Sequence, residues 1–117
     1  MPYIDKEEVT RLAFKRYKSK ESFEKSVWYL AELCCLINRN IKNADTIMPL
    51  ETDNVVLMLS ENVNGELVQP TEEEVTELAE LIYHENPEKA KLHWFIAEKS
   101  LLLEKIKEII EDNKKAV

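Results

Sequence analysis

The fold is decided by residues 23–41, FEKSVWYLAELCCLINRNI. Apolar side chains follow one another in this stretch at spacings of 4, 3, 4, 3 and 4: Phe23, Val27, Leu30, Cys34, Ile37 and Ile41. This period is typical of a helix with one continuous apolar seam. The pattern therefore predicts a helix from residue 22 to residue 41.

The same helix is expected to lie in the centre of the molecule. Glu32 is the one charged residue between Val27 and Ile37, and apolar side chains occupy the other faces. A helix that is apolar nearly all round is normally surrounded by other elements. Cys34 and Cys35 are then expected to be buried small apolar side chains without a redox or metal-binding role.

Signals at helix ends mark further helices on both sides of this centre. Asp5 suits the start of the first helix, because its carboxylate can accept a hydrogen bond from a free amide group of the first turn. Residues 71–74, TEEE, form a capping box that begins another helix. Residues 86–88 are expected to end that helix and to start the last one, which reaches about residue 114, with Asn86 as the N-cap and Pro87 at the first helical position.

Residues 44–70 leave two alternatives open. Pro49 and Gly65 suit the start and the end of a helix, whereas the apolar run at 55–59 favours a β-hairpin near residues 55–68. One glycine and 33% charged residues among 117 favour helices in the rest of the chain. We therefore expect one all-α domain over residues 1–117, a compact bundle of four to five helices, with the short hairpin as the alternative in the middle.

Charge is distributed unevenly along the chain. Twelve carboxylates and no lysine or arginine lie between Lys42 and Lys89, whereas the residues on either side of this region carry a net positive charge. The net charge of the whole chain is −7. An acidic region of this kind attracts basic partners and repels the phosphates of nucleic acids.

We therefore expect a basic protein partner, bound by carboxylates of the helix that begins after Thr71. The candidate partner-binding residues are Glu72, Glu73, Glu77 and Glu80. A second candidate surface, for a partner or for a homodimer, is the apolar group Leu102, Ile106 and Ile109 in the last helix. The hypothesis is a small regulatory protein, in one version an inhibitor from a phage or mobile element that fills a nucleic-acid-binding groove with carboxylates.

No arrangement of residues in the sequence indicates a reaction. His84 and His93 lie on either side of Pro87, so they cannot form a metal-binding pair at helical spacing on one helix. A single glycine excludes phosphate-binding loops of the dinucleotide or Walker type. We therefore expect no catalytic residue, no cofactor and no metal, and a role other than that of an enzyme.

One enzymatic alternative rests on paired carboxylates at helical spacing. Residues 74–77, EVTE, form one such pair, and residues 108–111, EIIE, form another. The two windows resemble the all-α, MazG-like nucleoside triphosphate pyrophosphohydrolases, which carry Glu-x-x-Glu on one helix and Glu-x-x-Asp on another. The resemblance implies Mg²⁺-dependent hydrolysis of a nucleotide. Glu111 departs from the family pattern, which has aspartate there.

The basic first helix supplies a second alternative, a DNA-binding regulator. Arg11, Lys15 and Lys18 lie at helical spacing and form a cationic ridge. This ridge can instead bind the acidic region, either within one chain or across a dimer. The net charge and the long apolar second helix both argue against a helix-turn-helix and against direct binding of nucleic acid.

The sequence also bears on where the protein works. Its longest apolar runs, such as residues 55–59, are far shorter than the roughly 20 residues that cross a bilayer. The first residues lead directly into charge, unlike a secretory signal, and the two cysteines are adjacent. We therefore expect a cytoplasmic protein that does not bind membranes.

Overall fold

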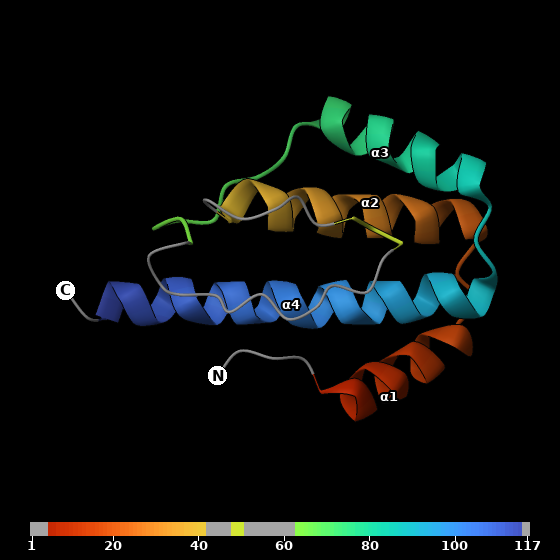
Figure 1. Ribbon diagram of the computed structural model, residues 1–117, viewed down its shortest axis with the longest axis horizontal. Coiled ribbons are helices and arrows are strands. Elements are labelled where there is room, and N and C mark those ends of the chain that lie inside the picture. Colours follow the sequence, from red (N-terminus) through yellow and green to blue (C-terminus); the bar gives the residue numbers. More distant parts are fainter. Residues whose placement is uncertain (1–4, 42–47, 51–62, 116–117) are drawn as a thin grey trace.

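The computed structural model describes residues 5–41, 48–50 and 63–115. Four helices follow in chain order: α1 (Lys6–Tyr17), α2 (Phe23–Asn40), α3 (Glu72–Glu85) and α4 (Lys89–Lys115) (Figure 1). The described part of the chain contains no strand beyond an isolated antiparallel bridge between Ile41 and Val63. The all-α prediction is confirmed. The alternative helix and hairpin between residues 49 and 68 fall largely outside the described residues.

The helix starts follow the signals in the sequence. The Asp5 carboxylate accepts a hydrogen bond from the amide of Glu7 at 3.0 Å. The Thr71 hydroxyl accepts one from the amide of Glu74 at 3.2 Å. Ser22 caps α2 in the same way. Each cap satisfies an amide that has no partner inside the helix.

The junction between α3 and α4 corrects one prediction. Asn86 does not cap the start of the last helix, as expected from the Asn-Pro pair, but the end of α3. Its backbone is left-handed, with φ of 48°, and its amide donates to the carbonyl of Tyr83 at 3.1 Å. Asparagine tolerates this conformation better than most residues, and α4 consequently begins at Lys89.

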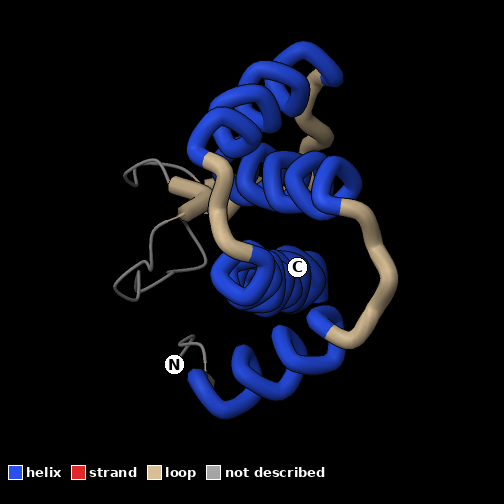
Figure 2. The backbone as a smooth tube through the Cα atoms, turned by 90° about the vertical axis from the view of Figure 1, so that its right-hand side faces the viewer, coloured by secondary structure: helices blue, strands red, loops and turns tan. Residues whose placement is uncertain are grey.

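The helices are stacked in the order α3, α2, α4, α1. Figure 1 shows α2 between α3 and α4, and α1 on the far side of α4; the view along the helices in Figure 2 agrees. The helix pairs in contact are α3 with α2, α2 with α4, and α4 with α1. Within the described residues, α1 and α3 are therefore the two outer helices, and they do not touch.

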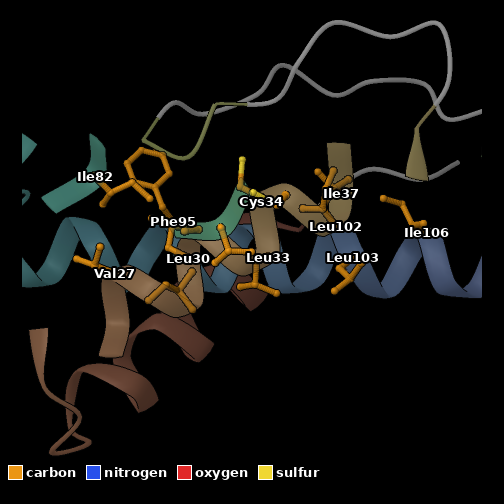
Figure 3. Close-up of a cluster of buried hydrophobic side chains, with 14 of the residues drawn as sticks. Val27, Leu30, Leu33, Cys34, Ile37, Ile82, Phe95, Leu102, Leu103 and Ile106 are labelled. Carbon is orange, nitrogen blue, oxygen red and sulfur yellow. The ribbon is translucent and has the colours of Figure 1, made fainter. Parts of the chain in front are cut away.

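The core lies on the apolar seam of α2, which confirms the central position predicted for this helix. Side chains from the seam meet Ile82 of α3 and a long row from α4 (Figure 3). The buried seam residues are Val27, Leu30, Cys34 and Ile37. A smaller cluster joins α1 to α4 through Val9, Ala13, Ala97 and Leu101.

Both cysteines of α2 are buried, as predicted, and neither forms a disulfide. Burial raises the pKa of the Cys35 thiol, although the charge of Arg39 opposes the shift. Asn38 donates a weak hydrogen bond to the sulfur of Cys34 at 3.7 Å. A buried thiol with a raised pKa is a poor nucleophile.

A buried asparagine at the end of α2 holds the segment that leads into α3. Asn40 is fully buried, and its side-chain amide donates to the carbonyls of Leu36 and Val68 at 2.7 and 2.9 Å. Its side-chain oxygen accepts from the amide of Val68 at 2.7 Å and from the side chain of Asn64 at 3.2 Å. Every polar atom of the Asn40 side chain is thus satisfied, which is the condition for burying it without a large cost.

Truncation of the seam tests the central role of α2. Leu30 and Ile37 are both 0% exposed, so Leu30→Ala or Ile37→Ala should lower the free energy of unfolding by about 2 to 5 kcal/mol. Denaturant melts provide the measurement, with the exposed Glu24→Ala of the same helix as the control. A loss below about 1 kcal/mol would contradict the burial of the seam.

The Asn40 contacts make a second prediction. Asn40→Ala leaves the amide and carbonyl of Val68 without their partner, so it should cost about 2 to 4 kcal/mol in denaturant melts. Asn64→Ala removes a half-buried side chain that donates to the carbonyl of Arg39 at 2.8 Å, and should cost only about 1 kcal/mol. Equal losses for the two variants would show that Asn40 does not hold this segment.

Candidate interaction surfaces

The outward side of α3 is a continuous acidic face, which we define as Glu73, Glu77 and Glu80. The three carboxylates are four and three residues apart, so they lie on one side of the helix. Val75 and Ile82 occupy the opposite side and pack on α2. All three glutamates are exposed. The whole of α3 contains six glutamates and no lysine or arginine.

One carboxylate of α3 is neutralised within the chain. Glu74 forms a two-point ion pair with Arg39 of α2, in which Nε lies 3.0 Å from Oε2 and Nη2 contacts Oε1. The four predicted partner-binding residues include Glu72 besides the acidic face. Glu72 is exposed in the first turn, where the helix dipole favours a carboxylate. None of these four forms an ion pair within the described residues.

The acidic face stores unfavourable electrostatic energy. Glu73 and Glu77 are four residues apart, and Glu77 and Glu80 are three apart, so each neighbouring pair repels. Like charges at these spacings destabilise a helix by about 0.2 to 0.5 kcal/mol per pair. A cationic surface placed against this face would remove the repulsion.

The apolar surface predicted on the last helix is largely filled within the protomer. Leu102 and Ile106 belong to the same core cluster as Ile37 of α2, and Ile109 packs half-buried against that cluster. The broad apolar character of α4 thus reflects packing inside the chain. These residues leave little apolar surface for a second copy.

The two carboxylate windows that resemble MazG-like hydrolases are not brought together. The first lies on α3 and the second on α4, and the backbones of these helices are not neighbours in the stack. Glu74 of the first window pairs with Arg39, and Glu108 and Glu111 of the second lie near lysines of their own helix. No cluster of three or more metal-binding side chains occurs in residues 5–41, 48–50 and 63–115.

The cationic ridge of α1 is exposed and lies on the opposite outer side of the molecule from the acidic face. Arg11 and Lys15 belong to α1, and Lys18 is its C-cap residue. Because α1 and α3 do not touch, the ridge does not bind the acidic face within the described part of one chain. An interaction between the two requires another molecule.

Next to the ridge lies an apolar groove between α1 and α4, which the sequence analysis did not anticipate. Its volume is about 340 Å³, and its lining residues are Thr10, Ala13, Phe14, Tyr17, Ala90 and Trp94. Phe14 and Tyr17 are 59% and 46% exposed. The aromatic residues Phe14 and Tyr17, three positions apart in α1, were the available signal in the sequence.

On the other side of α1, a polar network joins the first two helices. Arg16 Nη1 lies 2.6 Å from Glu21 Oε1, which also accepts a hydrogen bond from the Ser26 hydroxyl at 2.8 Å. The guanidinium of Arg16 stacks over the ring of Tyr29 at 4.7 Å. Burial opposes ionisation of Glu21, but the Ser26 hydrogen bond and the Arg16 charge prevail and lower the pKa of its carboxyl.

His93 of α4 lies beside this network and is 2% exposed. Its ring meets that of Tyr17 edge to face, and Nδ1 has no hydrogen-bond partner among the described residues. Burial lowers the pKa of His93, and the charges of Arg16 and Lys89 add to the shift, against the opposing effect of Glu21. His93 is therefore a neutral, structural histidine at neutral pH.

Comparison with known proteins adds no identification: the chain matches no family model, no curated protein and no solved structure. Within the described residues, no helix has both the length and the apolar character to span a lipid bilayer. A function can therefore be inferred only from the surfaces described above. They define a helical protein with an acidic outer helix and a basic one on opposite sides.

The buried histidine predicts how stability depends on pH. An unfolded histidine takes up a proton near pH 6.5, whereas His93 in the folded chain resists protonation until a lower pH. Its contribution to stability is present above pH 6.5 and is lost as the pH falls, by at most about 1.4 kcal/mol per pH unit. Denaturant melts at a series of pH values measure this slope.

His93→Phe should flatten the slope between about pH 7 and pH 5.5, because the replacement cannot be protonated. The exposed His84 offers the matched control, since His84→Gln should leave the slope in place. An unchanged slope in the His93 variant would refute the role assigned to this residue.

Proposed function

We propose that this chain is a small interaction protein that regulates a basic protein by binding it through the acidic face of α3. The observation that carries the proposal is the exposure of Glu73, Glu77 and Glu80 on one side of a helix that has no lysine or arginine. These carboxylates have no cationic partner among the described residues. A cationic group on a partner would relieve their mutual repulsion.

The sides of the acidic face add apolar contacts. Leu81 and Tyr83 are 63% and 51% exposed and lie on the two flanks of the face. Protein interfaces commonly combine apolar and aromatic anchors with charged groups around them. The charges steer the encounter and set its dependence on salt, while the anchors slow dissociation.

One form of this proposal is an inhibitor of a nucleic-acid-binding protein. A protein surface that binds phosphates is basic. A rigid helix with a row of carboxylates can present negative charge to that surface in place of the phosphates. The acidic helix then competes with nucleic acid for the same basic surface. Competition for a single surface would inhibit the partner without any chemical step.

Charge reversal tests the proposed function. Glu73→Lys, Glu77→Lys and Glu80→Lys combined should alter stability by less than about 0.5 kcal/mol each, because all three side chains are exposed. Capture of a basic protein from the native host should be lost, and the association rate with the isolated partner should fall most. Affinity and association rate are measured at low and high salt, since salt screens exposed charges over about 10 Å at 0.1 M.

The last helix offers a matched control. Glu104, Glu108 and Glu111 of α4 are exposed and repeat the spacing of the acidic face, so their combined replacement by lysine changes the net charge equally. This control variant should still bind the partner. If both triple variants bind like the parent at both salt concentrations, α3 is only a solvated helix and the proposal fails.

A further inference from the structure

We propose that copies of this chain associate head to tail, with Leu81 of α3 in one copy docked into the groove between α1 and α4 of the next. The inference rests on the proposed role of α3 as a binding surface and assigns that surface a partner, a second copy. It follows from three features of the described residues: the groove, the exposed leucine, and the charges beside each.

The groove is suited to a single apolar side chain on a helix. Ala13, Ala90 and Trp94 contribute small side chains and one large ring, and Phe14 and Tyr17 line it with exposed aromatic surface. Two ammonium groups lie beside these rings. Lys18 Nζ is 4.6 Å from the centre of the Phe14 ring, and Lys89 Nζ is 4.8 Å from that of Tyr17.

The complementary element is present on α3. Leu81 is the most exposed of the large apolar side chains described, at 63%. Glu77 and Glu85 stand four residues before and after it, so each lies about one turn away on the same side of the helix. Both are exposed, and neither forms an ion pair within the described residues.

The two elements match in chemistry. A leucine between two carboxylates meets an aromatic groove beside two lysines, so docking buries apolar surface while Glu77 and Glu85 approach Lys18 and Lys89. Recognition of an amphipathic helix by a groove uses this combination of anchor and flanking charge. The aromatic rings add contact area at a small entropic cost.

The fold keeps Leu81 away from the groove between α1 and α4 of the same copy. α1 and α3 are the outer helices on opposite sides of the stack and do not touch (Figures 1 and 2). A contact between unlike surfaces on opposite sides leaves a free groove at one end and a free α3 at the other. Such a heterologous contact adds further copies in a row instead of closing as a symmetric pair. One helix in one groove is a small interface, so the association should be weak and reversible.

Sedimentation equilibrium of the full chain at increasing concentration gives the first test. The average mass of the parent should rise continuously, past that of a dimer. Leu81→Gln removes the anchor, and Ala90→Glu places a carboxylate in the groove; each variant should remain monomeric at concentrations where the parent associates. Both positions are exposed, and glutamate suits the first turn of α4, so circular dichroism should show folded helices in both.

The decisive experiment mixes the two variants. The Leu81→Gln chain keeps its groove and the Ala90→Glu chain keeps its anchor, so an equimolar mixture should form a one-to-one dimer that cannot grow. A monomeric mixture, or a parent that stays monomeric at every concentration, overturns the inference. Loss of association in one variant but not in the other also overturns it, because that result indicates contact between like surfaces.

The charges are tested by a swap. Lys18→Glu with Lys89→Glu should prevent self-association, and so should Glu77→Lys with Glu85→Lys, whereas the chain that carries all four changes should associate again.

Ala90→Glu leaves α3 intact, so it separates this inference from the proposed function. If Ala90→Glu abolishes self-association while the basic host protein is still captured, both stand. If it leaves self-association unchanged, this inference fails and the proposed function does not.

Discussion

The arrangement of the molecule depends on the burial of α2 on two sides. Its apolar seam requires a long partner, and α4 supplies a matching row of buried side chains. Its other side is covered by α3, which contributes few buried residues, chiefly Val75 and Ile82. With both sides of α2 taken, α1 packs on α4 through a separate small cluster. The order of the stack thus follows from the central helix having the most apolar surface to bury.

This order has an electrostatic consequence. The packing places outermost two helices of opposite net charge: α1 with its cationic ridge and α3 with its acidic face. Among the helices of the described residues, each outer helix has one neighbour in the stack. The fold therefore keeps the acidic face and the cationic ridge apart, on opposite sides of the stack.

Two buried polar residues show how differently the fold treats such groups. Asn40 is satisfied at every polar atom of its side chain and joins the end of α2 to the segment before α3. His93 is buried with Nδ1 unpartnered in the described residues and with cationic groups of Arg16 and Lys89 close by. The hydrogen bonds of Asn40 involve no ionisable group, so they stabilise the fold at any pH. The packing of α1 beside His93, in contrast, is most stable while this histidine is neutral.

The sequence by itself determined the helical class, the central place of residues 23–41, the caps at Asp5 and Thr71, and the exposure of the acidic residues of α3. These features depend on local periodicity and on hydrogen bonds between near neighbours, which a single helix carries in its own residues. Only the tertiary structure decided that Leu102 and Ile106 are covered within the protomer, and that Phe14, Tyr17 and Trp94 meet in a groove. The physical reason is that an apolar side chain at helical spacing can face either the core or a partner. Which of the two it faces depends on the helix that packs across from it, and that helix is distant in the sequence.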